Sequence, residues 1–453
     1  MRTLKNLRTK RARKMFFNTP IRRVIAVLTV LLIALAACVI YVIHTHQRMP
    51  TITESDILGV YIARSELERE TSPNVPSEDL AALVQGNSGF AFDLYQKIRD
   101  ASGNLFFSPY SISSALVMTY AGARGETEQQ MADALHFSLP QDRLHPAFNA
   151  LDLALVSEEN ENFKLNIANS SWGQFGYPFR SEYLDILAAN YGAGMWLVDF
   201  MRDPEGARLK INDWVSDKTE NKIENILSPG SIDEYTRLVL ANAIYFNAQW
   251  RFPFSELQTE NSTFTLLDGG KVDVEMMSQA ETFRYASGEG YQVVELPYVN
   301  QDVSMLIILP TLENFNEFER TLDAGRVGEI AQNLESKRVA LKMPKFEFEA
   351  SLCLGDKLSE MGMTAAFDPQ EADFSGITGD RSLFIDAILH KAFISVKENG
   401  TEAAAATVVV VGTTSVPPEP SIEVSIDHPF IFMIRHNNTG SILFLGRVLD
   451  PTA

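Results

Sequence analysis

Cysteine and histidine, which build most disulfide frameworks, metal sites and nucleophilic catalytic centres, are scarce in this chain. Its 453 residues include only two cysteines, Cys38 and Cys353, and seven histidines. Because Cys38 lies in a long apolar run, no internal disulfide is expected to staple the rest of the chain. Its stability must therefore come from the core. We expect Cys353 to be a small buried apolar residue and not a nucleophile.

The chain also lacks the short motifs of the common enzyme classes. It contains no G-x-S-x-G, no H-E-x-x-H, no P-loop and no G-x-G-x-x-G. His44 and His46 are close-spaced, but they adjoin the apolar run and do not make a convincing metal site. His428 has no nucleophile in a recognisable setting. An ectoenzyme is therefore the least favoured class, and the sequence calls for no metal, nucleotide or other cofactor.

Basic residues are outnumbered, and they are unevenly placed. The formal net charge of −19 argues against a nucleic-acid-binding protein. Residues 1–23 hold nine of the 39 basic residues and no acidic residue, which leaves 30 basic against 58 acidic residues in the remainder. The remainder thus carries a formal charge of −28, and the basic segment stands apart from it.

Residues 24–43 carry no charge at all. Twenty helical residues at about 1.5 Å each span about 30 Å, the hydrocarbon thickness of a bilayer. The basic flank places residues 1–23 in the cytoplasm and the chain after His44 outside it. Two alternatives stay open: LAAC, ending at Cys38, resembles a lipobox whose cysteine would be lipidated, and a cleaved signal peptide would give plain secretion. All three interpretations export the rest of the chain.

The exported part divides into a tether and one large domain. Residues 44–79 are polar, contain three prolines and are predicted to form a tether, with a short element around 57–70. Residues 80–453 show no repeat, low-complexity break or second linker. Helical periodicity at 89–100 is followed by segments such as 239–250 that are rich in β-branched and aromatic residues. Because the helical and strand segments do not alternate strictly along the chain, the sequence predicts the α+β class.

Residues 398–412, ENGTEAAAATVVVVG, combine opposing secondary-structure preferences. Four alanines precede Thr407 and four valines follow it. Alanine favours helix, whereas a run of valines favours strand.

Six blocks of this chain, occurring in order between residues 80 and 453, resemble the serpin family. Because the blocks are separate and ordered, the resemblance is specific. The blocks are NLFFSPYSISSALVMTYAGARGETEQQM (104–131), INDWVSDKTENKI (211–223), VLANAIYFNAQWRFPF (239–254), MPKFEFEASLCLGDKLSEMGMTAAF (343–367), HKAFISVKENGTEAAAAT (390–407) and DHPFIFMIRHNNTGSILFLGRV (427–448).

The resemblance implies an α+β fold with three β-sheets, about nine helices and an exposed reactive loop at about residues 398–420. In this family a target serine protease attacks one loop bond and forms a covalent acyl-enzyme. The cleaved loop then inserts as a new central strand of the main sheet and carries the protease across the molecule. The protein would be a monomer, with loop–sheet polymers as a hazard of its metastability.

The hinge of the loop must be exposed first and become a buried strand later. In the inserted strand every second side chain faces the core. Counted from the hinge, the core-facing residues are uncharged, whereas Glu402 falls on the opposite face. By resemblance the hinge comprises Glu398, Gly400, Thr401, Glu402, Ala403, Ala404, Ala405, Ala406 and Thr407, and the core-facing series continues to Val409 and Val411.

The reactive bond follows by counting from the hinge glycine of the family. With Gly400 in that position, fifteen residues inclusive place the bond at Thr414–Ser415. The following SVPPE (415–419) resembles the segment after the cleaved bond in inhibitory serpins. A threonine here suits elastase-like or subtilisin-like proteases and does not suit trypsin-like ones. Cleavage after Val411 is the alternative.

Other residues match the mobile parts of the serpin scaffold. Four match the shutter, a hydrogen-bonded cluster beneath the main sheet: Ser108, Ser111, Asn242 and His390. Trp250 matches the aromatic residue of the breach, where the loop enters the sheet. Lys345 and Glu398 match a hinge ion pair.

The predicted function is that of a membrane-tethered, extracytoplasmic inhibitor of serine proteases that acts as a suicide substrate. Two alternatives remain: a non-inhibitory binding or transport protein on the same scaffold, and an inhibitor of papain-like cysteine proteases. Sparse cysteines, the acidic exported part and the lipobox-like LAAC point to a prokaryotic source.

Overall fold

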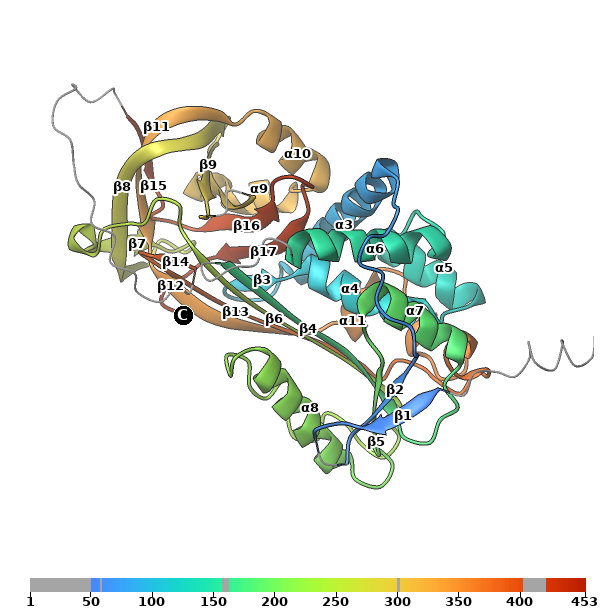
Figure 1. Ribbon diagram of the computed structural model, residues 1–453. Coiled ribbons are helices and arrows are strands. Elements are labelled where there is room, and N and C mark those ends of the chain that lie inside the picture. Colours follow the sequence, from blue (N-terminus) through green and yellow to red (C-terminus); the bar gives the residue numbers. More distant parts are fainter. Residues whose placement is uncertain (1–49, 58, 157–162, 300–301, 402–420) are drawn as a thin grey trace, which may run out of the picture. The chain divides into compact units, whose positions relative to one another are not determined.

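The computed structural model describes residues 50–57, 59–156, 163–299, 302–401 and 421–453 (Figure 1). The predicted membrane or signal segment with Cys38, the hinge after Thr401 and the predicted reactive bond lie outside these residues. Within residues 50–453 the chain forms one compact unit.

Ten α-helices and two extended sheets make up the described residues, so the α+β class is confirmed. The periodic segment predicted as helical at 89–100 falls largely within α3. The helices are α3 (Ser77–Ile98), α4 (Pro109–Tyr120), α5 (Gly125–Ala134), α6 (Gln141–Val156), α7 (Ser181–Tyr191), α8 (Pro204–Lys218), α9 (Phe315–Arg320), α10 (Ala324–Gln332), α11 (Gly355–Glu360) and α12 (Ser375–Thr378). Three short 3₁₀ turns are η1 (Glu256–Gln258), η2 (Leu312–Asn314) and η3 (Ala365–Phe367).

The first sheet has eight strands, and its long central strands cross the molecule (Figure 1). In spatial order they are β1 (Thr51–Glu54), β2 (Tyr61–Arg64), β5 (Met195–Val198), β4 (Phe163–Gln174), β6 (Leu238–Gln249), β14 (Gly400–Thr401), β13 (Ala387–Lys397) and β12 (Phe346–Cys353).

The second sheet has nine strands and joins parts that the serpin resemblance assigns to two sheets. The reason is β8, an 18-residue strand that pairs with β7 along its first part and with β9 along its last part. The described strands therefore form two continuous sheets instead of three. In order they are β15 (Ile422–Ser425), β11 (Glu335–Pro344), β8 (Lys271–Gly288), β9 (Tyr291–Pro297), β10 (Val303–Pro310), β16 (Phe430–His436), β17 (Ile442–Val448) and β3 (Leu105–Phe107), with β7 (Glu260–Thr265) beside β8.

Strand β6 is buried on both faces, which explains why it reads as a nearly continuous apolar run. Leu240 and Ile244 belong to the large core on the α4 side. Val239 and Ala241 alternate with them and belong to a smaller core that α8 covers with Trp214. The eight-stranded sheet is thus enclosed by helices on both sides at its centre.

The tether was predicted at residues 44–79, and its described part, residues 50–79, belongs to the same compact unit as the rest. Strand β2 pairs with β5 at the sheet edge, and Val60 is fully buried in the smaller core. Arg69 donates to Asn149 and forms an ion pair with Asp152 at 2.6 Å. The boundary of the compact unit therefore lies at residue 50 and not at residue 80, and the short element expected around 57–70 includes β2.

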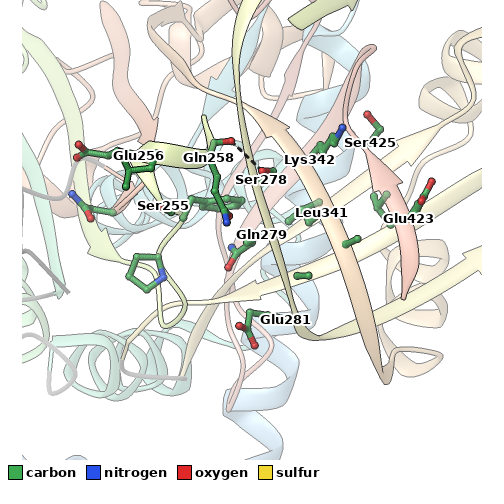
Figure 2. A pocket seen from close by; sticks show the side chains of 17 residues that line it. Ser255, Glu256, Gln258, Ser278, Gln279, Glu281, Leu341, Lys342, Glu423 and Ser425 are labelled. Carbon is green, nitrogen blue, oxygen red and sulfur yellow. Dashed lines mark hydrogen bonds between the residues drawn. The ribbon is translucent and has the colours of Figure 1, made fainter. Parts of the chain in front are cut away.

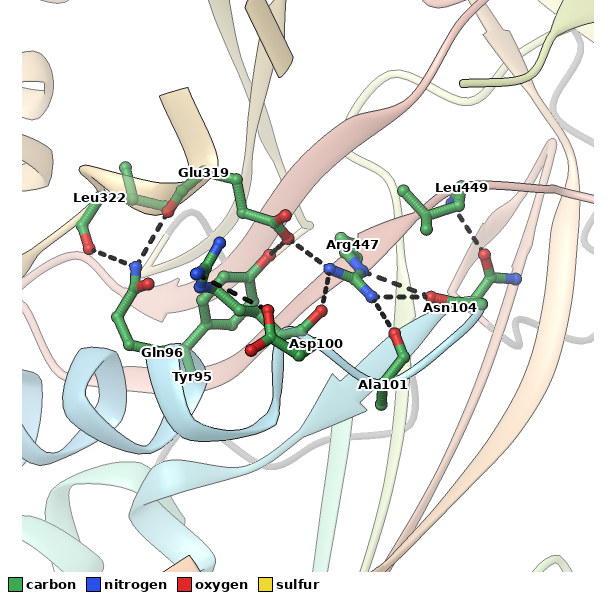
Figure 3. A network of polar contacts seen from close by, with 11 residues as sticks. Tyr95, Gln96, Asp100, Ala101, Asn104, Glu319, Leu322, Arg447 and Leu449 are labelled. Carbon is green, nitrogen blue, oxygen red and sulfur yellow. Dashed lines mark hydrogen bonds and ion pairs between the residues drawn. The ribbon is translucent and has the colours of Figure 1, made fainter. Parts of the chain in front are cut away.

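A buried charge cluster ties the end of α3 to α9 and β17 (Figure 3). Arg447 lies 2.7 Å from Glu319, and both side chains are about 95% buried. Tyr95 donates to Glu319 at 2.6 Å, and Arg447 also donates to the carbonyls of Arg99 and Ala101. Because each charge is paired and hydrogen-bonded, burying the cluster costs far less free energy than burying the same charges without partners.

Cys353 is exposed, contrary to the expectation that it would be buried. It ends β12, the last strand of the eight-stranded sheet, whose residues alternate between partly covered and exposed positions. Period-2 alternation directs Cys353 away from the core. Within the described ranges, no helix combines the length and apolar character needed to cross a membrane.

Candidate functional site

Strands β6 and β13 form a fork at the centre of the eight-stranded sheet. Their lower parts pair directly in parallel over seven residue pairs, from Ala387–Val239 to Phe393–Tyr245. Above this point the two strands separate, and the two-residue strand β14 lies between them, antiparallel to both. The chain that leads into the predicted loop therefore enters the sheet at the mouth of the fork.

Gly400 and Thr401 fit this position for different reasons. A Cβ atom on Gly400 would lie 2.1 Å from the carbonyl oxygen of Ala248, so only glycine fits without displacing β6. Thr401 lies opposite Ala248 on β6 and Val396 on β13, and its side chain is fully buried.

The hydroxyl of Thr401 is held by an aromatic pair. Its Oγ1 lies 2.7 Å from the hydroxyl of Tyr298, and burial raises the pKa of Tyr298 well above its ordinary value. The Tyr298 ring stacks on Trp250 with centroids 4.6 Å apart and an angle of 10°. The backbone N–H of Trp250 donates to the Asn399 carbonyl, and its indole N–H donates to the Lys397 carbonyl at 3.0 Å. Trp250, predicted as the breach residue, thus bonds directly to the backbone of residues 397 and 399, and it supports the Thr401 side chain only through the stacked Tyr298 ring.

Glu398 and Lys345 contact each other beside the hinge. Lys345 Nζ lies 3.0 Å from Glu398 Oε1 and 3.2 Å from Glu275, and Thr259 donates to Glu398 at 2.8 Å. Burial alone would raise the pKa of Glu398, but the hydrogen bonds from Lys345 and Thr259 outweigh it and lower the pKa. The carboxylate is therefore kept ionised, and it fixes where the chain turns into β14.

Ser108, Ser111, Asn242 and His390 lie together beneath the fork, at the centre of the paired part. Ser108 caps α4, accepting from the backbone N–H of Ser111 at 3.1 Å. The backbone N–H of Ser108 donates to His390 Nε2 at 3.1 Å, so Nδ1 carries the proton and donates to the Asn242 carbonyl oxygen. Asn242 in turn donates to Ser111 Oγ at 2.6 Å. The cluster links α4 to both strands of the fork.

His390 is neutral in this setting. Complete burial lowers its pKa to about 3, because the low-dielectric interior disfavours the charged form of the imidazole. Its two ring nitrogens are nevertheless both hydrogen-bonded. His390 therefore acts as a directional link between β13, α4 and β6, and separating the two strands must break it.

Sequence reasoning missed two members of this site. Asn169 lies opposite Asn242 on β4, accepts from Ser111 Oγ at 3.1 Å and donates to the Ser111 carbonyl at 3.2 Å. Tyr298 follows β9 in ELPY. Asn169 could have been noticed in the sequence, because it is an amide within a largely buried strand, β4. In the structure it lies directly opposite Asn242 on β6. No local signal marks Tyr298, because its partner is 103 residues away.

Several predicted site residues cannot be placed. Outside the described residues lie Cys38, the hinge residues Glu402, Ala403, Ala404, Ala405, Ala406 and Thr407, and the candidate reactive-bond residues Val411, Thr414 and Ser415.

Known proteins are similar to this chain in sequence and in fold over most of its length. The family model described as Serpin (serine protease inhibitor) matches residues 85–451. A serpin-like protein of Thermococcus kodakarensis is 43% identical over 372 residues, covering 82% of this chain and 86% of that protein. The leukocyte elastase inhibitor of Xenopus laevis is 39% identical over 373 residues, covering 80% and 97%.

Solved structures agree with this match. The crystal structure of Tengpin, a thermophilic serpin in the native state, has a TM-score of 0.77 at 31% identity and covers 86% of this chain and 99% of its own. Uncleaved ovalbumin has a TM-score of 0.74 at 29% identity, covering 82% and 100%.

Proposed function

The chain belongs to the serpin family, and we propose that it inhibits serine proteases as a suicide substrate. The family match and the relatives named as elastase inhibitors support protease inhibition in general. The observation that carries the specific mechanism is β14, whose Thr401 is already seated between β6 and β13. Cleavage of the loop would let the rest of it follow Thr401 into the fork.

The register of β14 assigns a partner to each following residue. Since Thr401 lies opposite Ala248, the same antiparallel register brings Ala403 opposite Phe246 and Ala405 opposite Ile244. Both partners belong to the large core. Val409 and Val411 would then meet Leu240 and Leu238 of the same core. These residues are apolar, as the surroundings of each partner require.

The opposite face of the sheet also requires uncharged side chains at the positions that follow Glu402. Ala406, Val408 and Val410 would lie opposite Ala243, Ala241 and Val239, in the smaller core under α8. Glu402 would lie opposite Asn247, a half-buried residue near the open end of β6. A charged residue anywhere after Glu402 would be buried unpaired on one face or the other. This explains why the alanine and valine runs contain no charge.

Thr407 is the polar exception in this segment, and the register supplies a reason. It would stand between Asn242 on β6 and His390 on β13, because each lies opposite it when the two registers of β14 are extended. Insertion must separate these two side chains, which now share a hydrogen bond. A threonine hydroxyl can both donate and accept, so it can form hydrogen bonds with Asn242 and His390 after the bond between them is broken.

The proposed targets are elastase-like or subtilisin-like proteases, with the reactive bond at Thr414–Ser415 and Val411 as the alternative. We also propose that residues 24–43 keep the inhibitor at a membrane with its folded unit outside the cytoplasm, either as an anchor helix or through lipidation at Cys38. An inhibitor of papain-like cysteine proteases and a non-inhibitory binding protein remain the competing functions.

The test is a panel of elastase, subtilisin, chymotrypsin, trypsin and a papain-like enzyme, each incubated with the purified protein. We expect a covalent complex that survives denaturing electrophoresis, and a released C-terminal peptide that begins at Ser415 by mass spectrometry. A peptide beginning at Gly412 would move the bond to Val411. Cleavage without any complex, combined with no gain in thermal stability on cleavage, would refute the insertion mechanism and favour the binding protein.

A further inference from the structure

Asn399 and Gly400, where the chain enters β14, form the only Asn-Gly pair in the sequence. Asparagine is among the thermolabile residues of proteins. A following glycine increases this lability, because it has no Cβ atom to keep its backbone nitrogen away from the asparagine side chain. That nitrogen can attack the side-chain amide carbon. A reaction at this pair would change the backbone of the hinge itself.

The side chain of Asn399 is accessible to such a reaction. It is half-buried, and it forms no hydrogen bond with any described residue. Asn399 lines the pocket beside η1 (Figure 2), whose volume of about 1120 Å³ greatly exceeds the roughly 30 Å³ share of one water molecule. Water can therefore reach the amide group, and ammonia can leave it.

The backbone of the pair, in contrast to this side chain, is held on all sides while β14 lies in the fork. The Asn399 carbonyl accepts from the backbone N–H of Trp250 at 2.9 Å. Gly400 is paired with Gln249 on β6 and with Lys397 on β13. A Cβ atom on Gly400 would lie only 2.7 Å from Cα of Gln249, so the glycine backbone is packed tightly against β6.

Ring closure requires the movement that these contacts oppose. The ring that forms holds ψ of Asn399 outside the helical and extended regions that an open chain occupies. Rotation about the Cα–C bond of Asn399 must therefore turn its carbonyl away from Trp250 and take Gly400 out of both strand pairings. The reaction should proceed only in molecules whose β14 has left the fork, as amide hydrogen exchange does in a locally opened segment.

We propose that Asn399–Gly400 is a site of spontaneous deamidation that β14 protects while it lies in the fork. The Gly400 nitrogen loses its proton to water or hydroxide and forms a bond to Cγ of Asn399, and the side-chain nitrogen takes up a proton and leaves as ammonia. Water then opens the five-membered imide. Opening at Cγ gives aspartate, whereas opening at the backbone carbonyl carbon gives isoaspartate. One water is consumed and one ammonia is released overall, without an oxidant or a reductant.

Isoaspartate at position 399 would displace the hinge from its register. The chain then runs through the former side chain, which adds one CH₂ group between residues 399 and 400, and the former backbone carbonyl becomes a free carboxylate. The contact of residue 399 with Trp250 and the bond from Thr401 to Tyr298 at 2.7 Å could no longer both form. This effect on inhibition rests on the proposed function, whereas the deamidation does not.

The rate of deamidation is measured on the full chain in detergent at mildly alkaline pH. Proteolytic fragments that contain residue 399 are followed by mass spectrometry, and a synthetic peptide of residues 395–405 gives the unprotected rate. Thr401→Arg frees β14, because its guanidinium group cannot be buried unpaired in the fork. Glu402→Arg is the matched control. Tyr298→Phe is a milder variant, which removes only the hydroxyl bonded to Thr401.

We expect the unmodified protein and Glu402→Arg to deamidate at least about tenfold more slowly than their peptides, which corresponds to about 1.4 kcal/mol or more of protection. Tyr298→Phe should react several-fold faster than the unmodified protein, and Thr401→Arg should approach the rate of its peptide. Deamidation of the unmodified protein at the peptide rate would overturn the proposal. Equal rates in the unmodified protein, Tyr298→Phe and Thr401→Arg would also overturn it.

A second measurement compares inhibition with the fraction of isoaspartate after incubation. The unmodified protein should lose trapping of its target protease in proportion to isoaspartate, and Asn399→Gln should keep it under the same conditions. Asn399→Asp adds the charge without the extra CH₂ group and should trap protease normally. Equal loss in Asn399→Gln would refute the effect on the hinge. If no protease is trapped even before incubation, the proposed function fails, while the rates of deamidation still test the site.

Discussion

Placing a charge at Thr401 tests the insertion register directly. In the Thr401→Arg variant a guanidinium group would have to occupy a fully buried site. The residues facing it, Tyr298, Ala248 and Val396, carry no carboxylate that could pair with it. Burying an unpaired charge costs several kcal/mol, of the order of 3–5. Releasing β14 from the sheet should cost less free energy than burying the guanidinium group there.

The cost of that release can be bounded from the structure. β14 has two residues paired on each side and the Thr401–Tyr298 bond. At about 1 kcal/mol net for each hydrogen bond, losing them destabilises the uncleaved protein by roughly 2–5 kcal/mol. We therefore expect Thr401→Arg to fold, with a freed hinge and a lower melting temperature.

The larger effect should appear after cleavage, when insertion competes with hydrolysis of the acyl-enzyme. An insertion step that is about 3 kcal/mol harder is slower by roughly 150-fold. Hydrolysis of the acyl-enzyme should then be faster than insertion, and the variant should be cleaved as a substrate. The assay is the stoichiometry of inhibition of elastase, or of whichever panel protease is trapped, with denaturing gels that separate complex from cleaved inhibitor.

Glu402→Arg is the matched control, because it places the same side chain one residue later, where the register directs it to the opposite, half-buried face. It should keep forming the complex. If Thr401→Arg traps protease with unchanged stoichiometry, or if Glu402→Arg fails equally, the register derived from β14 is wrong.

Three further predictions follow from other parts of the chain. Thr414→Arg should gain inhibition of a trypsin-like protease, measured as a covalent complex on denaturing gels; if none forms, the reactive bond lies elsewhere. Cys38→Ser should still sediment with membranes if residues 24–43 are an anchor helix, whereas its release into the medium would favour the lipoprotein. Because His390 has a pKa of about 3 against an ordinary 6.5, unfolding takes up a proton, and stability should fall as the pH drops from 6.5 towards 3. The slope from this one group is up to about 1.4 kcal/mol per pH unit; His390→Gln should remove it in denaturant unfolding at pH 7 and 4.5, and an unchanged slope would show that His390 is not buried neutral.

The elements that carry the hinge were predictable where local pattern and tertiary role agree. The segment predicted as a strand at 239–250 forms β6 from Leu238 to Gln249, since its β-branched and aromatic residues suit a strand buried on both faces. Ser108 caps α4 and is followed by Pro109 at the first helical position, where a proline is favourable. The family resemblance added the grouping of Ser108, Asn242 and His390, which no periodicity could have supplied.

What remained unpredicted depends on pairing between distant segments. The four residues of β1 are all exposed, so no alternation distinguished them from a polar tether. Tyr298 gains its role only because Thr401 is delivered beside it by β14. In each case the controlling interaction is long-range, and single-sequence patterns report mainly local preference.

The composition of the loop can be understood from the exchange of strand pairings that insertion would bring about. It would replace one parallel ladder, the seven pairs between β6 and β13, by two antiparallel ladders on either side of the new strand. An antiparallel pairing is somewhat more stable per residue than a parallel one, and each inserted residue would bring its backbone groups to both new ladders. That gain requires N–H groups, which proline lacks. Residues 401–411 contain no proline, whereas Pro417, Pro418 and Pro420 all follow the proposed reactive bond. Those prolines would remain on the released side of the cut and never enter the sheet. The distribution of proline therefore agrees with the distribution of charge: both leave residues 403–411 free of groups that an inserted central strand could not accommodate.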